Sequence, residues 1–274
     1  EKKIPLLGEL ALAAPHLSEK VVAITGTNGK TTVTGLIGEL LEASGKKVFV
    51  GGNIGTPLLD YLCQEDRADV LVLELSSFQL ESAGDFRPDI GILLNVTPDH
   101  LDRHRSMVDY AMAKMKLFAH QGKNDTAILC SDDPMCKQIM PLLTTQKVIS
   151  FGTRQEGEAR GEGNTVSVNL QGRQEQYSLA GTDLTSHTGL LNSGAAILAA
   201  ILLGCSRNEI QGGLKSFVTA PHRLQLIASK KGVLYYDDSK ATNTGAVLSA
   251  LASFSGNVIL IAGGRGKGED YTIL

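Results

Sequence analysis

The feature that most constrains the fold of this chain is an apolar run that leads through a glycine-rich turn into a helix. The run is Val21–Ile24, the turn is Thr25–Gly29 (TGTNG), and Lys30-Thr31-Thr32 opens the helix. Glycines let the backbone approach an anion closely, and the N–H groups of the loop and first helical turn then point at phosphate oxygens. This order predicts a phosphate-binding loop in which Lys30 reaches the terminal phosphates and Thr31 binds Mg²⁺.

The loop is shorter than the usual G-x-x-x-x-G-K-[ST] pattern, because Ile24 stands where the first glycine would be. An ordinary strand–turn–helix joint with a chance Gly-Lys-Thr is the alternative. The residues from Thr31 to Ala43 favour the phosphate loop, because aliphatic side chains recur there at helical spacing and Gly45 ends the run.

Composition excludes several classes of protein. The 274 residues carry a net charge of −3 with acids and bases nearly balanced, which indicates neither a nucleic-acid binder nor a membrane-surface binder. No apolar run is long enough to span a bilayer, and no signal peptide is visible. The four scattered cysteines match no zinc or CxxC pattern, so we expect reduced thiols in a cytoplasmic protein.

Short apolar runs alternate with helical patterns over residues 19–151, and one clear helix is expected at Met107–Phe118. Fully apolar strands between helices predict an α/β fold with a mostly parallel sheet flanked by helices. In such sheets ligands bind at the carboxyl ends of the strands. The expected strands are Val21–Ile24, Val48–Val50, Val70–Leu73, Ile90–Leu94, Ala127–Cys130 and Val148–Phe151.

The second half of the chain changes pattern. Alternating residues on both sides of Gln171-Gly172 predict a hairpin over 165–179, and helices are expected at 190–203 and 207–217. A new α/β unit begins after Pro221, and it is too short to be a complete domain. Its expected elements are strands at Leu224–Ala228, Val233–Tyr236 and Val258–Ile261 and a helix at Gly245–Ser253.

Polar residues follow two of the predicted strands. Glu74 ends the strand Val70–Leu73, and beside a phosphate loop it suits a Mg²⁺ ligand, whereas a solvent-exposed strand end is the alternative. A second polar loop, Asn95–Asp102, follows the strand Ile90–Leu94. Within it His100 is either a ligand of a second cation or a structural histidine, and its position after a strand leaves both open.

Lys114 shares one face of its predicted helix with Met107, Ala111 and Phe118. A lysine on an apolar face either extends its amine to solvent or holds it desolvated, and a desolvated neutral amine can act as a nucleophile. The spacing alone favours extension to solvent.

Three other polar segments stand out. Asn53 lies in a glycine-rich turn after a strand and is interpreted as a turn residue. Ser76 and Gln79 present hydroxyl and amide groups to a substrate or cap a helix. The segment Asp237–Asn243 follows a strand and opens a helix, so it either binds a nucleotide or caps that helix.

Together these motifs resemble the Mur ligase family, the ATP-dependent amide-forming enzymes of peptidoglycan synthesis, with folylpolyglutamate synthetase as a relative. Thr25–Thr32 (TGTNGKTT) resembles the ATP loop of the family. Leu75–Leu80 (LSSFQL), Asn95–Asp102 (NVTPDHLD) and Asp238–Asn243 (DSKATN) resemble the members that add D-glutamate. The likeness covers nearly the whole chain. A sister ligase, and a nucleotide-binding module without ligase activity, are the alternatives.

The resemblance implies a monomeric cytoplasmic ligase that uses ATP and two Mg²⁺ ions to add D-glutamate to UDP-N-acetylmuramoyl-L-alanine through an acyl phosphate. Lys30, His100 and Lys114 would be catalytic, and Lys114 would be carbamylated, which reverses the expectation from spacing. ATP would contact Gly26, Thr27, Asn28, Gly29, Lys30, Thr31, Thr32, Asn192, Arg223, Asp238 and Lys240. The metal ligands would be Thr31, Glu74, His100 and the Lys114 carbamate, and the substrate contacts Asn53, Ser76, Gln79, Thr242 and Lys267.

The family is built of three domains, and the resemblance divides this chain accordingly. Residues 1–18 would be a remnant of an N-terminal domain, and residues 19–218 the central ATP-binding domain. Residues 219–274 would begin a Rossmann-like C-terminal domain. We therefore expect a fragment that lacks most of the first domain and the end of the last.

Overall fold

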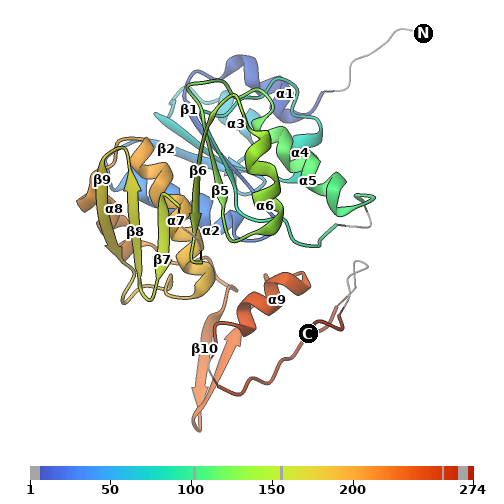
Figure 1. Cartoon of the computed structure of the whole chain (residues 1–274), viewed down its shortest axis with the longest axis vertical. Helices are drawn as coiled ribbons and strands as arrows, with labels where there is room; N and C mark the ends of the chain where they lie inside the picture. The colour runs from blue at the N-terminus through green and yellow to red at the C-terminus, as the bar shows by residue number, and fades with distance from the viewer. Residues whose placement is uncertain (1–6, 101–102, 155–156, 255, 265–270) are drawn as a thin grey trace.

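The computed structural model describes residues 7–100, 103–154, 157–254, 256–264 and 271–274. Its body is one sheet whose strands lie in the order β2-β3-β1-β4-β5-β6-β7-β8-β9 (Figure 1). Neighbouring strands are parallel from β2 to β7, and β8 and β9 continue the sheet as an antiparallel hairpin. The strands are β1 (Lys20–Thr25), β2 (Val48–Gly52), β3 (Val70–Glu74), β4 (Ile90–Leu93), β5 (Thr126–Cys130), β6 (Lys147–Gly152), β7 (Ala159–Glu162), β8 (Thr165–Leu170) and β9 (Arg173–Ser178).

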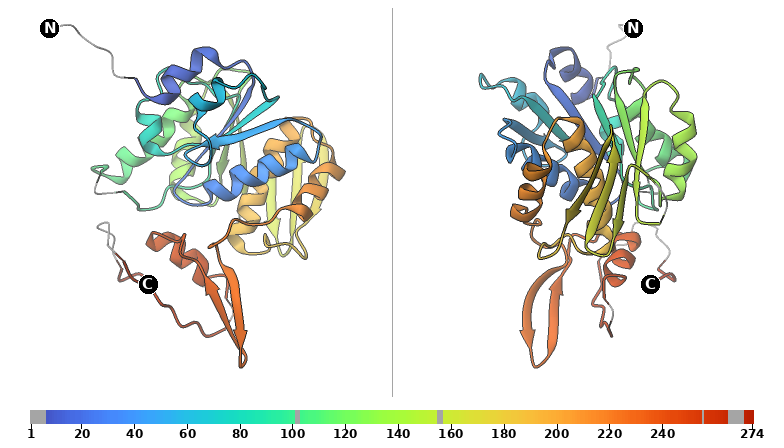
Figure 2. Two further views of the ribbon diagram at one scale, coloured as in Figure 1. Left: turned by 180° about the vertical axis from the view of Figure 1, so that it is seen from behind. Right: turned by 60° about the vertical axis from the view of Figure 1, so that its left-hand side comes forward.

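Helices cover both faces of the sheet. Figure 2 shows α2, α7 and α8 against one face and α4, α5 and α6 against the other, with the strands between them. The helices of the body are α1 (Glu9–Ala13), α2 (Lys30–Glu42), α3 (Leu58–Leu62), α4 (Ser77–Glu81), α5 (Met107–Met115), α6 (Pro134–Ile139), α7 (His187–Leu202) and α8 (Arg207–Ser216). Single 3₁₀ turns lie at Ala14–His16 (η1), Lys116–Phe118 (η2) and Met140–Leu142 (η3).

The core follows from the apolar runs. Every residue of β3, β4 and β5 is buried, as expected for parallel strands with helices on both faces. The prediction of a mostly parallel α/β sheet is therefore confirmed. The strand β7 was not predicted, because Ala-Arg-Gly-Glu has no apolar pattern; it is a strand because β6 and β8 hydrogen-bond to its two edges.

The residues after 220 form a separate small unit. The strands β10 (Gln225–Lys230) and β11 (Val233–Asp237) pair only with each other, and α9 (Thr244–Leu251) follows them (Figure 1). The strand predicted at Val258–Ile261 is wrong. No described strand lies beside this run to accept its backbone hydrogen bonds, and Ile259 and Ile261 are 90% and 94% exposed.

Two further expectations concern the whole chain. All four cysteines are free where the structure describes them, in agreement with the expectation of reduced thiols. Within the described ranges, the helices are too short or too polar to cross a bilayer.

Candidate active site

The carboxyl ends of three strands bring the predicted motifs to one edge of the sheet. The strand β1 pairs with β3 and with β4, so that Ile24 lies beside Glu74 and Thr25 beside Leu93. The glycine-rich loop leaves β1 at this edge, and the loop that carries His100 leaves β4 beside it. This is the position at which parallel α/β sheets bind their ligands.

Two glycines give the loop its shape. Gly26 and Gly29 have φ values of +153° and +89°, which L-residues adopt only under strain. A Cβ added at Gly29 would also lie 2.7 Å from the Asn192 Oδ1 atom on α7, and one at Gly26 would lie 3.0 Å from the Leu94 Cβ. Glycine is therefore required at both positions, and Asn192 packs directly against the loop.

Asn95 holds the loop in place. Its Oδ1 atom accepts hydrogen bonds from the backbone N–H groups of Thr27 (3.1 Å) and Asn28 (2.8 Å), and its Nδ2 atom donates to the Asn28 carbonyl at 3.0 Å. Asn95 belongs to the predicted polar loop Asn95–Asp102, but no role was predicted for it from the sequence. The sequence signal that could have predicted this role is an amide side chain shortly after the end of β4, the strand that pairs with β1.

Two lysine amines meet at one carbonyl oxygen of the loop. Lys30 Nζ donates to the Gly26 and Thr27 carbonyls at 2.9 and 3.0 Å, and Lys114 Nζ donates to the same Gly26 oxygen at 3.0 Å. Burial lowers the pKa of the Lys30 amine, although the Glu74 and Asp99 carboxylates act to raise it. Burial, together with the charge of Lys30, lowers the pKa of Lys114 well below its usual range.

The extension of Lys114 to solvent, which spacing favoured, is wrong. Its side chain is only 1% exposed, because this face of α5 packs inward and the Gly26 carbonyl offers the amine a partner there. Lys114 Nζ lies 4.3 Å from the centre of the Tyr110 ring. Burial raises the pKa of the Tyr110 hydroxyl to about 12. The Thr27 Oγ1 atom donates to that hydroxyl at 3.3 Å.

Glu74 ends β3 and is 2% exposed. Its Oε1 atom accepts a hydrogen bond from Asn53 Nδ2 at 3.0 Å, whereas its Oε2 atom has no hydrogen-bond partner among the described residues. A buried carboxylate oxygen without a partner is costly in an empty site, and it suits a hard cation such as Mg²⁺. The described residues form no cluster of three His, Cys, Asp or Glu ligands, so further ligands would have to be phosphate, hydroxyl or modified lysine oxygens.

The two histidines of the β4 loop differ in their surroundings. His100 has a φ of +53°, its Nε2 atom lies 3.6 Å from Asp99 Oδ2, and its ring meets Phe78 edge-on. No functional role was predicted for His104. Its side chain is buried, and its Nε2 atom lies 3.0 Å from Ser77 Oγ. Burial lowers the pKa of His104, which favours the neutral ring.

Ser76 and Gln79 form a capping box at the start of α4. Ser76 Oγ accepts from the Gln79 N–H at 3.2 Å, and the Ser76 N–H donates to Gln79 Oε1 at 3.0 Å. Helix capping, one of the two interpretations of this segment, is therefore present.

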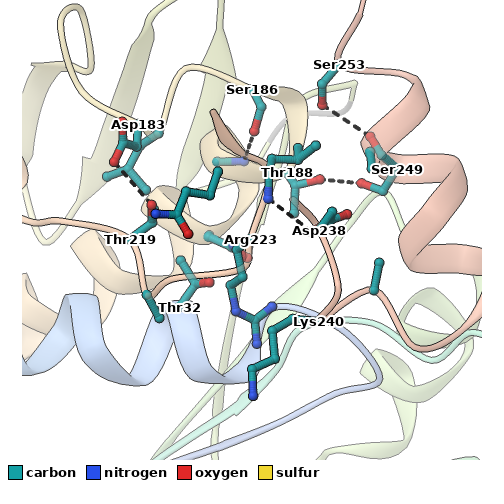
Figure 3. Close-up of a pocket in the computed structure, with 18 of the residues that line it drawn as sticks. Thr32, Asp183, Ser186, Thr188, Thr219, Arg223, Asp238, Lys240, Ser249 and Ser253 are labelled. Atoms are coloured by element: carbon teal, nitrogen blue, oxygen red, sulfur yellow. Dashed lines mark hydrogen bonds between the residues drawn. The ribbon is translucent and has the colours of Figure 1, made fainter. Parts of the chain in front are cut away.

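A cavity of about 670 Å³ lies between the loop end of α2, the segment 182–189 and the unit after residue 220 (Figure 3). Figure 3 shows the side chains of Arg223 and Lys240 extending in the same direction. Asp238 accepts a hydrogen bond from the Leu224 N–H at 3.0 Å, and burial raises its pKa. The predicted residues that line the cavity are Asn28, Gly29, Thr32, Asn192, Arg223, Asp238 and Lys240.

Comparison with known proteins agrees with this architecture. The family model for the Mur ligase middle domain matches residues 24–200. The chain belongs to the Mur ligase family.

Similar sequences share one name. This Mur ligase chain is 52% identical over 271 residues to the UDP-N-acetylmuramoylalanine–D-glutamate ligase of Desulfotalea psychrophila, covering 99% of the chain and 59% of that protein. It is 42% identical over 271 residues to the ligase of the same name from Pelotomaculum thermopropionicum, covering 98% of the chain and 59% of that protein. The chain thus spans about three-fifths of the length of these relatives.

Similar structures are Mur ligases as well. The MurF ligase of Thermotoga maritima, solved in complex with ADP, superposes with a TM-score of 0.70 at 25% identity, covering 90% of this chain and 60% of that one. MurF from Acinetobacter baumannii superposes with a TM-score of 0.72 at 21% identity, covering 88% of this chain and 55% of that one. This likeness shows that the two proteins share a fold.

In this Mur ligase chain the predicted site residues fall into two neighbouring groups. The first surrounds the loop and the ends of β1, β3 and β4, and includes Lys30, Glu74 and Lys114. The second lines the cavity. Thr242 is exposed and does not line the cavity, and Lys267 lies outside the described residues.

Proposed function

We propose that this Mur ligase chain belongs to a monomeric enzyme that joins D-glutamate to UDP-N-acetylmuramoyl-L-alanine in cytoplasmic peptidoglycan precursor synthesis. One observation carries the proposal: the amines of Lys30 and Lys114 converge on the Gly26 carbonyl of the glycine loop. The Asp99 carboxylate acts on both amines, and the Glu74 carboxylate acts on Lys30. The names of the similar proteins supply the substrates. The similar ligases are longer than this chain, so the activity is proposed for the whole protein.

ATP would lie across both groups of residues. Its phosphates would meet the backbone N–H groups at the start of α2, because those of Thr27 and Asn28 already donate to Asn95. The Lys30 amine would exchange two backbone carbonyls for phosphate oxygens. The rest of the nucleotide would occupy the cavity beside Asn192, where Arg223, Asp238 and Lys240 face it.

Two Mg²⁺ ions would be held by Thr31, Glu74, His100 and a carbamate on Lys114. The unpartnered oxygen of Glu74 supports the first of these sites. Mg²⁺ would offset the negative charge of the phosphates while they react. The Lys114 amine is buried beside Lys30, which favours its neutral form. A neutral amine can attack carbon dioxide, forming an N–C bond and releasing one proton.

The reaction would then proceed in two steps. An oxygen of the alanyl carboxylate attacks the γ-phosphorus of ATP, the bond to the β-phosphate oxygen breaks, and an acyl phosphate and ADP result. The D-glutamate amine attacks the acyl carbon, phosphate leaves, and the amine loses a proton. Lys30 would offset charge between the two reacting anions. Asn53, Ser76, Gln79, Thr242 and Lys267 are the proposed substrate contacts.

We also propose the domain division 1–18, 19–218 and 219–274. The separation of the β10–β11 pair from the nine-stranded sheet supports the boundary near residue 219.

The test is phosphate release by the whole protein with ATP, UDP-N-acetylmuramoyl-L-alanine and one amino acid at a time. We expect release that depends on D-glutamate and not on L-alanine, a diamino acid or L-glutamate. Preference for another amino acid would indicate a sister ligase. ATP hydrolysis that ignores every amino acid would instead indicate a nucleotide-binding module without ligase activity.

A further inference from the structure

Asn243 connects the unit after residue 220 to the phosphate loop. It is the N-cap of α9, where its Oδ1 atom accepts a hydrogen bond from the Ala246 N–H at 2.8 Å. It is also only 6% exposed, although an N-cap asparagine needs no burial to cap its helix. A buried side-chain amide must find partners for its N–H groups, and here these partners lie in the body of the protein.

Both N–H groups of the Asn243 amide cross to the body. Nδ2 donates to Asn28 Oδ1 at 3.0 Å and to Asp99 Oδ2 at 3.2 Å. Asn28 returns a hydrogen bond from its Nδ2 atom to Asn243 Oδ1 at 3.3 Å. One side chain thus contacts both the phosphate loop and the buried carboxylate that faces Lys30 and Lys114.

The backbone is closely packed at the same point. A Cβ added at Gly245 would lie 3.2 Å from Thr97 Oγ1 and 3.6 Å from Asn28 Nδ2. The start of α9 therefore approaches the loop closely, and the hydrogen bonds of Asn243 are part of a contact that side chains larger than glycine would disturb.

We propose that Asn243 is a positioning residue that fixes the phosphate loop and the Asp99 carboxylate when the unit after residue 220 packs against the body. Asn28 is held from one side by Asn95 and from the other by Asn243. Asp99 is oriented by the Asn243 amide beside the two lysine amines. The contact would make the arrangement of the phosphate site depend on the docking of α9. Its role in turnover rests on the proposed function, whereas its role in nucleotide binding does not.

The test separates helix capping from the contact with the body. Asparagine, aspartate and serine cap helices about equally well, so Asn243→Ser and Asn243→Asp keep the cap of α9. Both remove the two donors, and Asn243→Asp also places a second carboxylate beside Asp99. The matched control is Asn208→Asp, which adds the same charge on the exposed face of α8.

We expect the complete protein with Asn243→Ser to bind MgADP about tenfold more weakly in calorimetry, because a charge-assisted hydrogen bond and a loop contact are lost. Asn243→Asp should be weaker still, and Asn208→Asp unchanged. The thermal midpoint of Asn243→Ser should stay within about 2 °C of wild type, because its cap is kept. In a double-mutant cycle with Asn28→Ala, the losses in affinity should be less than additive.

Wild-type MgADP affinity in Asn243→Ser would overturn the proposal and leave Asn243 a helix cap. Strictly additive losses with Asn28→Ala would also overturn it. These outcomes are distinct from failure of the proposed function, which would show as wild-type protein that releases no phosphate with D-glutamate. If the ligase activity is present, Asn243→Ser should raise the KM for ATP more than it lowers kcat.

Discussion

The Gly26 carbonyl oxygen concentrates the chemistry of this protein at the scale of single residues. It accepts hydrogen bonds from two lysine amines, at 2.9 Å from Lys30 and 3.0 Å from Lys114. Two ammonium groups beside one neutral oxygen would repel each other, and burial lowers the pKa of both amines. Such a pair costs free energy in the folded protein and prepares the site for an anion.

We therefore expect Lys114→Met to be at least as stable as wild type and to lose activity. The free energy of unfolding should rise by about 1 kcal/mol, because a buried amine beside a like charge is removed and Lys30 still satisfies the Gly26 carbonyl. Phosphate release should fall by at least about 100-fold. Urea unfolding and the phosphate assay measure the two effects. Lys116→Met, on the exposed side of the same helical segment, is the control; a large loss of stability in Lys114→Met would contradict this account.

Gly29 tests the geometry of the loop. Gly29→Ala combines a strained φ of +89° with a Cβ 2.7 Å from Asn192 Oδ1. We expect nucleotide affinity to fall more than tenfold and stability to fall by about 2 kcal/mol. Gly163→Ala, at a φ of +57° with open space around it, carries strain alone and should cost about 1 kcal/mol without changing affinity. Equal effects of the two variants would refute a role for the contact with Asn192.

At the scale of elements, β1 is fixed at both ends by polar contacts. Its carboxyl end enters the phosphate loop, and Glu19 directly precedes its amino end. The Glu19 carboxylate is 4% exposed and accepts hydrogen bonds from Tyr61 Oη at 2.6 Å and from Arg67 Nη2 at 3.0 Å. Arg67 also donates to the carbonyl of His16 in η1. These contacts tie the start of β1 to α3 and to η1.

The Glu19 contacts predict a pH dependence of stability. Burial acts to raise the pKa of Glu19, but the hydrogen bonds from Arg67, Tyr61 and the backbone outweigh it and lower the pKa from 4.5 to about 2. A depressed folded-state pKa stabilises the protein above the unfolded-state value, and this stabilisation is lost as the pH falls from about 4.5 towards 2.

Glu19→Gln should therefore cost about 2 kcal/mol at pH 6, and less than half as much at pH 3. Urea unfolding at the two pH values measures the difference between the variant and wild type. The control is Glu65→Gln, an exposed glutamate, for which we expect little change at either pH. A cost that is the same at both pH values would show that the Glu19 contacts act without their charge.

At the scale of the whole molecule, the cavity lies where the unit after residue 220 meets the body. Among the described residues, hydrogen bonds cross this boundary, or the segment that leads to it, at three places. Asn243 bonds to Asn28 and Asp99, the Thr188 hydroxyl on α7 hydrogen-bonds the Ser249 hydroxyl on α9, and Thr219 donates to Asp183 at 3.1 Å. Because few apolar residues bury themselves at this boundary, we expect the two parts to move relative to each other during turnover.

A reversible crosslink across the cavity tests that motion. The double variant Thr188→Cys/Ser249→Cys should form a disulfide under oxidising conditions, because its two positions already touch through their hydroxyls. We expect turnover to fall at least about tenfold on oxidation and to recover on reduction. Each single cysteine variant should be insensitive to oxidation. Undiminished turnover of the oxidised double variant would refute the need for motion.

The local order of the chain determined much of this structure. Apolar runs specified β1, β3, β4 and β5, because strands covered by helices on both faces bury nearly all of their side chains. The order strand, glycine turn, Lys-Thr-Thr specified the loop, since only glycine accepts the backbone angles at positions 26 and 29. The position of Glu74 follows from the local sequence as well, because a polar residue that ends a parallel strand lies where the carboxyl ends of the strands meet.

Only the tertiary structure decided which groups meet. Spacing placed Lys114 on an inner helical face but could not show that a loop carbonyl 88 residues away would hold its amine. The contacts of Asn243 with Asn28 and Asp99 join residues 215 and 144 positions apart. In the sequence, Asn243 cannot be told from an ordinary N-cap residue of a helix. The run at 258–261 has strand composition and forms no strand. A strand needs a neighbour to take its hydrogen bonds, and a neighbour is a property of the fold and not of the local sequence.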